Sequence, residues 1–249
     1  MLRSIVRQQI EAARAVQDAR IPSSGHPARL VNGRRYLQLA FNDDWNLAMQ
    51  TLPAIAKSDR ILIEAGTPYL KREGMAGIRN IRRQWSGPIV ADMKTADGGA
   101  EEVAMVHEAG ANAITALGSS PTETLDRFVA ACEALGVDSM LDMLGVADPL
   151  RVLMRLKRPP RVVVLHRGRD EESTRGKVIQ YRHVNRLHSK FDVLISAAGG
   201  VDLREARSAI FNGANIVVVN IVPPDKPWAG ICSDEDVGEM SRKFLATIE

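Results

Sequence analysis

From about residue 35 onward, short apolar runs alternate with longer stretches in which apolar residues recur at helical spacing. The eight runs are YLQLAF (36–41), RILIEA (60–65), PIVAD (88–92), NAITAL (112–117), SMLDML (139–144), RVVVLH (161–166), DVLISAA (192–198) and NIVVVNIV (215–222). Each run has the length of a strand, and its continuous apolarity is typical of strands that are covered on both faces, as in a parallel sheet.

The intervening stretches carry the start and stop signals of helices, which are polar residues before the first turn and glycine after the last. The clearest cases are residues 101–109 before Gly110, residues 121–135 between Ser120 and Gly136, and residues 202–212 before Gly213. Eight strand–helix units predict a single (β/α)8 barrel, which we place at residues 35–249. An open doubly wound sheet is the alternative fold, but it more often has a glycine-rich turn after its first strand, and NDDW (42–45) is not one.

Residues 1–34 precede the first predicted strand and form a separate segment. Their apolar residues fall at helical spacing, with arginines opposite: Leu2, Ile5, Val6, Ile10, Ala13 and Val16. This pattern predicts an N-terminal helical extension that covers the barrel floor or a partner subunit. A helix lying on a membrane surface is the alternative, but the apolar stripe is short and rich in alanine.

Composition narrows the class of protein. The chain has 249 residues, of which 45% are hydrophobic, enough for one large core. No apolar run approaches the ~20 residues that span a bilayer, and the first residues lack the apolar stretch of a secretory signal. The two cysteines, Cys132 and Cys232, show neither a disulfide pattern nor metal-binding spacing. We therefore expect a cytoplasmic protein with no membrane segment.

The charge balance argues against nucleic acid as the main partner. The isoelectric point is about 9.0, but the formal net charge is only +3 and basic residues are interspersed with acidic ones. Aromatic residues make up 4% of the chain, too few to suggest stacking surfaces for single-stranded nucleic acid. An anionic small-molecule ligand explains the mild basic excess equally well.

The segment IVADMKTADGG (89–99) places charged residues at the end of a predicted buried strand. Side chains alternate along a strand, so Asp92 and Lys94 point the same way, into the mouth of the barrel. Asp97 follows in the loop and can approach the same place. Flanking carboxylates favour a charged Lys94, which can donate a proton or stabilise an anion. A solvated salt bridge at a strand end is an equally good explanation of this segment alone.

Other strands end in residues that can support chemistry. Glu64 closes the second run, Asp142 lies in the fifth, His166 ends the sixth, and the seventh ends in Gly199 and Gly200. Each has a structural explanation by itself, but together they occupy matching ends of consecutive strands. The paired glycines expose backbone amides that can bind a phosphate.

A hard cation can join two of these strand ends. Glu64 and Asp92 lie on adjacent predicted strands, so their carboxylates can share one Mg²⁺, which prefers oxygen ligands and retains some waters.

Six segments resemble, in the same order, the orotidine monophosphate decarboxylase superfamily, within it the branch of 3-hexulose-6-phosphate synthase and 3-keto-L-gulonate-6-phosphate decarboxylase. They are LQLAF (37–41), IEAGTPYLKREG (63–74), IVADMKTADGG (89–99), DMLGVADP (142–149), LHRGRD (165–170) and AAGGV (197–201). The resemblance covers roughly residues 36 to 222. The fifth-strand segment is more similar to the synthase, whereas H-R-x-R-D in the sixth is similar to the decarboxylase.

This resemblance implies a barrel homodimer with its active site at the subunit interface and a phosphorylated small-molecule substrate. Glu64 and Asp92 would hold Mg²⁺, and Lys94 would contact an enediolate intermediate. Asp97 would reach into the partner's site.

The remaining roles implied by the resemblance concern protons and phosphate. His166 and Arg169 would handle proton transfer, and the amides of Gly199 and Gly200 would bind the substrate phosphate.

The chain departs from the family pattern at two strand ends. The first strand usually ends in Asp, where this chain has Asn42, which cannot supply a negative charge beside the lysine. The eighth strand normally ends in Gly-Arg or Gly-Gly, where this chain has Asn220 and Ile221, followed by PPDKPWAG (223–230). Lys226 in this loop either replaces the missing cation, or the loop shapes a different pocket or has no ligand role.

Four functions stay open from the sequence. The first is a magnesium-dependent aldehyde-lyase like 3-hexulose-6-phosphate synthase, in which the enediolate of ribulose 5-phosphate attacks formaldehyde. The second is a decarboxylase or another lyase on a related phosphorylated ligand, favoured by Arg169. The third is a barrel that has lost catalysis and serves as a binding or regulatory subunit, which Asn42 and Asn220 would permit. The fourth, nucleic-acid binding, depends on the isoelectric point alone.

Overall fold

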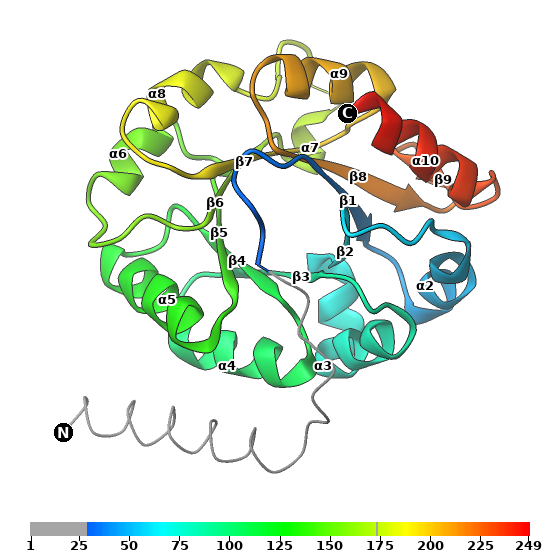
Figure 1. The fold of residues 1–249 in the computed structure, drawn as a ribbon, viewed down its shortest axis with the longest axis horizontal. Coiled ribbons are helices and arrows are strands. Elements are labelled where there is room, and N and C mark those ends of the chain that lie inside the picture. Colours follow the sequence, from blue (N-terminus) through cyan, green and yellow to red (C-terminus); the bar gives the residue numbers. More distant parts are fainter. Residues whose placement is uncertain (1–28, 173) are drawn as a thin grey trace.

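Eight parallel strands form a closed barrel in the computed structural model, which describes residues 29–172 and 174–249. The strands are β1 (Tyr36–Phe41), β2 (Ile61–Ala65), β3 (Ile89–Thr95), β4 (Ala113–Leu117), β5 (Asp138–Asp142), β6 (Val162–His166), β7 (Leu194–Ala198) and β8 (Ile216–Val222). They pair in sequence order, and β1 also pairs with β8, so the barrel has no open edge (Figure 1). The predicted (β/α)8 barrel is confirmed, and the open doubly wound sheet is excluded.

Helices surround the barrel and cover the outer face of every strand (Figure 1). They are α2 (Trp45–Thr51), α3 (Thr67–Gln84), α4 (Gly99–Ala109), α5 (Thr122–Leu135), α6 (Pro149–Leu153), α7 (Arg169–Glu172), α8 (Val184–His188), α9 (Leu203–Phe211) and α10 (Val237–Thr247), with short 3₁₀ turns at Leu52–Ala54 and Tyr181–His183. No helix among the described residues is long and apolar enough to cross a membrane.

The alternation of side chains along the strands separates two apolar cores. The outer core, between strands and helices, contains side chains such as Leu39, Ile63 and Phe128. The inner core fills the barrel with Ala40, Val90 and other side chains from the alternate positions. Because both faces of each strand are buried, the strands read as continuous apolar runs.

Toward the carboxyl ends of the strands, the inward positions change from apolar to polar. Val90 faces the inner core, and two residues later along β3 the inward side chain is Asp92. On β5 the inward Met140 is likewise followed by Asp142. The barrel therefore has an apolar interior and a polar mouth.

The strand β3 is irregular where it reaches this mouth. The β3–β4 register shifts between Ala91 and Thr95. Lys94 has a φ of 50°, in the left-handed region of backbone conformation that residues other than glycine rarely adopt. The backbone N–H of Lys94 donates to the Thr115 hydroxyl at 2.9 Å, which helps to hold this conformation. Asp92 and Lys94 still point the same way, as the alternation predicts.

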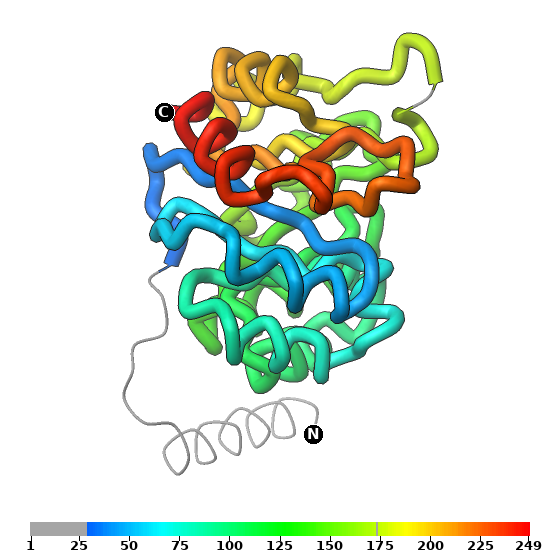
Figure 2. The backbone as a smooth tube through the Cα atoms, turned by 90° about the vertical axis from the view of Figure 1, so that its right-hand side faces the viewer, coloured from blue at the N-terminus to red at the C-terminus, as the bar shows by residue number. Residues whose placement is uncertain are grey.

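The end of the described chain closes against its beginning. Helix α10 lies beside the start of β1 (Figure 2), and Arg35 donates to the backbone oxygens of Ile248 at 3.2 Å and Glu249 at 2.8 Å. The predicted N-terminal helical extension, residues 1–34, lies almost entirely outside the described residues.

A ninth, very short strand was not predicted. Strand β9 (Ile231–Cys232) pairs with Ile221 and Val222 at the end of β8 and thereby fixes the far end of the loop 223–230 beside the barrel mouth.

Candidate active site

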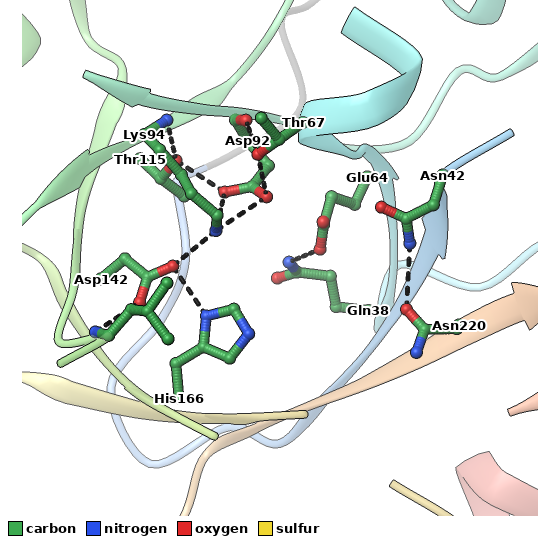
Figure 3. Close-up of polar contacts among 11 residues, drawn as sticks. Gln38, Asn42, Glu64, Thr67, Asp92, Lys94, Thr115, Asp142, His166 and Asn220 are labelled. Carbon is green, nitrogen blue, oxygen red and sulfur yellow. Dashed lines mark hydrogen bonds and ion pairs between the residues drawn. The ribbon is translucent and has the colours of Figure 1, made fainter. Parts of the chain in front are cut away.

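The mouth of the barrel holds a cavity of about 430 Å³. Eight of the residues proposed from the sequence line it: Asn42, Glu64, Asp92, Lys94, His166, Arg169, Gly199 and Asn220. Asp142, which was named from the sequence among the strand-end residues that can support chemistry, also lines it, and three further lining residues had not been singled out: Gln38, Thr67 and Thr115. Figure 3 shows that the side chains of all these residues except Arg169 and Gly199, which it does not label, converge on one space from opposite sides of the barrel.

Lys94 is the centre of a charged network. Its Nζ lies 3.0 Å from the carboxylate of Asp92 and 2.6 Å from Oδ2 of Asp142 (Figure 3). Burial by itself would lower the pKa of Lys94, but the two carboxylates outweigh burial and hold the pKa above its ordinary value. Lys94 is therefore a fixed positive charge inside the cavity.

Asp142 connects Lys94 to the histidine. Its Oδ2 lies 2.8 Å from Nδ1 of His166, and its Oδ1 accepts the backbone N–H of Leu144 at 2.9 Å. Burial would raise the pKa of Asp142, but His166 and Lys94 overcome burial and lower it, so the group is a carboxylate. With Nδ1 donating to Asp142, Nε2 of His166 faces the centre of the cavity (Figure 3).

The same ion pair acts on the histidine. Burial would lower the pKa of His166, but the neighbouring Asp142 outweighs burial and raises it. His166 thus has a carboxylate partner that stabilises its protonated form, which is the arrangement that a proton-transferring imidazole requires.

Two threonines hold the Asp92 carboxylate in place. The hydroxyl of Thr67, at the start of α3, lies 2.7 Å from Oδ2 of Asp92, and the hydroxyl of Thr115 lies 2.8 Å from Oδ1. Thr115 is the single polar residue in the run AITAL, so its position on the inward face was readable as a signal. The contact of Thr67 with Asp92 could not be read from the sequence, because Thr67 belongs to a helix whose position beside β3 depends on the fold.

Glu64 is buried on β2 and accepts a hydrogen bond of 2.5 Å from Nε2 of Gln38 on β1. Burial raises the pKa of Glu64 to about 7, and the negative charge of Asp92 adds to the effect. The repulsion between Glu64 and Asp92 is the kind of interaction that a shared cation relieves.

The donor set at this point suits magnesium. Two carboxylates facing one cavity are the usual protein contribution to a Mg²⁺ site, because this ion keeps several waters and takes further oxygens from its substrate. Among residues 29–172 and 174–249 no cluster of three or more His, Cys, Asp or Glu has metal-binding geometry. The residues therefore fit a hard ion held by Glu64 and Asp92 and do not form a closed structural metal site.

Asn42 and Asn220 face each other across the β1–β8 junction. Nδ2 of Asn42 donates to Oδ1 of Asn220 at 3.0 Å (Figure 3). Nδ2 of Asn220 donates to the backbone oxygen of Ala229 at 3.3 Å. The amides therefore connect the end of β1 to the loop 223–230. Asp43 turns away and pairs with Arg72 at 2.6 Å, so the second carboxylate beside Lys94 comes from β5 and not from the first strand.

The glycine turn after β7 requires its glycines. Gly199 has a φ of 106° and Gly200 a φ of 62°, and a Cβ on Gly199 would lie 1.9 Å from the backbone oxygen of Arg167. Gly199 lines the cavity, whereas Gly200 lies behind it, where its backbone oxygen faces the Arg167 guanidinium at 3.3 Å.

The three remaining predicted residues differ in position. Arg169 lines the cavity, and its guanidinium stacks on the ring of Trp228 at 3.9 Å. Lys226 is exposed outside the cavity, 3.6 Å from Asp225 and 5.7 Å from the Trp228 ring. Asp97 is exposed in the loop after β3 and does not line the cavity of its own chain. Its expected role in a partner's site stays a prediction.

Comparison with known proteins places these features in a family. The model of the orotidine 5'-phosphate decarboxylase / HUMPS family matches residues 36–220. The bifunctional enzyme Fae/Hps of Methanosarcina barkeri is 36% identical over 215 residues, which are 86% of this chain and 52% of that protein. The same-named protein of Methanocaldococcus jannaschii is 34% identical over 214 residues, 84% of this chain and 51% of its own length.

Solved structures agree with this placement. The crystal structure of 3-hexulose-6-phosphate synthase from Salmonella typhimurium has a TM-score of 0.73 at 25% identity and covers 86% of this chain and 98% of its own. The chain spans about half the length of the curated relatives that it matches. By the extent of the family match and the identity to these relatives, the chain belongs to the orotidine 5'-phosphate decarboxylase / HUMPS family.

Proposed function

We propose that this protein is an aldehyde-lyase that joins formaldehyde to ribulose 5-phosphate and forms a 3-hexulose 6-phosphate. The observation that carries the proposal is the continuous contact of Asp92, Lys94, Asp142 and His166 beside Glu64 in one cavity. The names of similar proteins, Fae/Hps and 3-hexulose-6-phosphate synthase, support the same reaction.

The first step needs a base and a means of stabilising negative charge. His166 takes a proton through Nε2 from the ketose carbon next to the carbonyl, and the electron pair of that C–H bond moves toward the carbonyl oxygen. The resulting enediolate lies beside Lys94. The positive charge of Lys94 is already in position, so it stabilises the enediolate without the reorganisation that water would require. Mg²⁺ held by Glu64 and Asp92 would supply a second positive charge and polarise the carbonyl.

The second step forms the carbon–carbon bond. The enediolate carbon attacks the carbon of formaldehyde, and the new alkoxide receives a proton from His166, which returns to its neutral state. Asp142 holds the imidazole by Nδ1 and balances its positive charge between the two transfers.

The substrate phosphate has one clear attachment point, because Gly199 presents backbone to the cavity next to β8. We propose that the phosphate binds there, and the predicted contact of the Gly200 amide would need Gly200 to turn toward the cavity, because it lies behind Gly199. Lys226 reaches the phosphate only if the loop 223–230 moves, because its side chain lies outside the cavity.

We also propose a cytoplasmic homodimer in which Asp97 of each subunit completes the other subunit's site. The exposed position of Asp97, next to a strand end that carries Asp92 and Lys94, supports this arrangement.

A carboxy-lyase is the second candidate, and Arg169 is the observation that favours it. Arg169 lines the cavity shortly after His166, the last residue of β6, and its guanidinium can supply a positive charge for a substrate carboxylate. Loss of carbon dioxide would leave the same enediolate for Lys94 to stabilise, and His166 would protonate it.

One set of assays separates these functions. Formaldehyde consumption with ribulose 5-phosphate and Mg²⁺, abolished by EDTA and restored by added Mg²⁺, is the result expected for the aldehyde-lyase. Carbon dioxide release from 3-keto-L-gulonate 6-phosphate without formaldehyde consumption would contradict the aldehyde-lyase and support the carboxy-lyase. Binding of Mg²⁺ and sugar phosphate without either reaction would indicate a barrel that has lost catalysis.

A further inference from the structure

Gln38 is a buried polar residue with no evident packing role. It lies on the inward face of β1 between Tyr36 and Ala40, is 3% exposed, and lines the cavity. Its inward neighbours on the same strand belong to the apolar inner core. An apolar side chain of the same length would fill this space without burying an amide.

The amide nitrogen of Gln38 is committed to Glu64. Nε2 lies 2.5 Å from Oε2 of Glu64 (Figure 3). With a cation bound beside it, Glu64 would be ionised, and an ionised carboxylate can only accept hydrogen bonds, so in that state this contact determines which way the amide is oriented. The nitrogen faces Glu64, and the carbonyl oxygen Oε1 must face elsewhere.

That carbonyl oxygen is left without a partner. Oε1 is buried and accepts no hydrogen bond from any described residue. Leaving a buried acceptor unpaired costs free energy, and such groups are rare in folded proteins. An unpaired acceptor on a residue that lines a cavity therefore indicates that a bound ligand donates a hydrogen bond to it.

We propose that Gln38 is a positioning and recognition residue of this site: its amide nitrogen orients the Glu64 carboxylate toward Asp92, and its carbonyl oxygen accepts a hydrogen bond from a hydroxyl group of the polyol phosphate. The inference rests on the proposed function, because it presupposes a sugar-phosphate ligand and a cation between Glu64 and Asp92. It assigns Gln38 two separable tasks, one toward the metal ligand and one toward the substrate.

The first test measures the metal-directed task. In the chain of 249 residues, Gln38→Met removes both polar groups at similar side-chain length. Binding of Mn²⁺, used as a spectroscopic substitute for Mg²⁺, is measured by electron paramagnetic resonance of the free ion. We expect the Kd for Mn²⁺ to rise about 10- to 100-fold, the range typical of lost partners of metal ligands. Gln50→Met, at an exposed position on α2, is the matched control and should bind Mn²⁺ like the wild type.

The second test measures the substrate-directed task at saturating Mn²⁺, where the metal contribution is constant. The Kd of Gln38→Met for ribulose 5-phosphate, measured by calorimetry, is expected to rise about tenfold, while inorganic phosphate, which lacks the polyol hydroxyls, should bind equally to variant and wild type. If the affinities for ribulose 5-phosphate and for inorganic phosphate fall by the same factor, Gln38 does not recognise a substrate hydroxyl, and this part of the inference is wrong.

Gln38→Asn is a second variant that tests for a folding defect. It keeps the amide, but its side chain is one methylene shorter and does not reach Glu64. It should also weaken Mn²⁺ binding. Normal Mn²⁺ and sugar-phosphate affinities in both variants, with only a lower melting temperature, would show that Gln38 is structural and would overturn the inference alone. A wild-type protein that binds neither Mn²⁺ nor ribulose 5-phosphate would overturn the proposed function and this inference together.

Discussion

Nζ of Lys94 on β3 lies 2.6 Å from Oδ2 of Asp142 on β5, and the same oxygen lies 2.8 Å from Nδ1 of His166 on β6. One carboxylate oxygen thus connects the charge that we propose stabilises an anion to the ring that we propose transfers a proton. Because Asp142 is almost fully buried, this connection is little screened by solvent. We therefore expect a change in the protonation of His166 to alter the electrostatic environment of Lys94.

Replacement of Lys94 should remove catalysis without unfolding the barrel. We expect Lys94→Ala to lower kcat by at least about 10²-fold, the usual effect of losing one charge-stabilising donor. Asp92 keeps the hydroxyls of Thr67 and Thr115, so the far-ultraviolet circular dichroism should be unchanged. Lys71→Ala, at an exposed position on α3, is the matched control. A Lys94 variant with a near-normal rate would exclude the residue from the mechanism.

Replacement of Asp142 should change the ionisation of the histidine. The carboxylate is the main cause of the raised pKa of His166, and burial opposes it. In Asp142→Asn we therefore expect the pKa of His166 to fall below that in the wild type, followed by NMR of the imidazole protons across a pH titration. The limb of the kcat profile that depends on protonated His166 should move to lower pH. An unchanged His166 titration would mean that another group sets its charge.

Magnesium binding should depend on pH through Glu64. The pKa of Glu64 in the metal-free fold is about 7, above its ordinary value of 4.5, so the fold favours the protonated group. The resulting stability is fully present below about pH 4.5 and is lost as the pH rises through 7. A cation needs the ionised carboxylate and restores that loss. The increase in melting temperature caused by Mg²⁺ should therefore grow between pH 6 and 8.

The control for this pH dependence is Glu64→Gln, which keeps the side-chain length and removes the titrating group. Its melting temperature should respond less to Mg²⁺ and show no such growth with pH. An equal Mg²⁺ effect at pH 6 and pH 8 in the wild type would contradict the assignment of Glu64 as a metal ligand.

The sequence predicted the barrel because each strand is buried on both faces and therefore has a continuous apolar run. It also predicted which side chains of one strand share a direction, as for Asp92 and Lys94. It did not predict that Asp142 bonds to Lys94, since this contact joins strands that are not neighbours and depends on the stagger of the barrel. Gln38 and Thr115 were not singled out, although each is a polar residue within an apolar run, and the sequence alone could not show what they contact.

Asn42→Asp, which introduces the carboxylate that the family usually has at the end of the first strand, should not increase the aldol activity. Nδ2 of Asn42 donates to Asn220, and aspartate has no donor for this bond. Asn42→Asp would place two acceptors face to face, or turn the Asn220 amide away from Ala229. Either way one hydrogen bond is lost, at a cost of about 1 kcal/mol. We expect a melting temperature a few degrees lower and no increase in aldol activity, measured against Asn46→Asp on the exposed surface of α2.

A rise in aldol activity in Asn42→Asp would give the opposite conclusion. It would show that the network of Lys94 lacks a negative charge that Asp142 does not supply.

The shared-site dimer can be tested by complementation. If Asp97 completes the partner's cavity, then Lys94→Ala and Asp97→Ala homodimers are both inactive, but their heterodimer contains one site with neither change. Mixing the two variants, with subunit exchange promoted by mild denaturant and followed by native mass spectrometry, should then restore up to about a quarter of the wild-type rate per chain, since random exchange makes half of the dimers mixed. Recovery would require both residues to act from different chains. If the mixture stays inactive although heterodimers form, then Asp97 serves the cavity of its own chain and the loop after β3 must fold inward to bring it there.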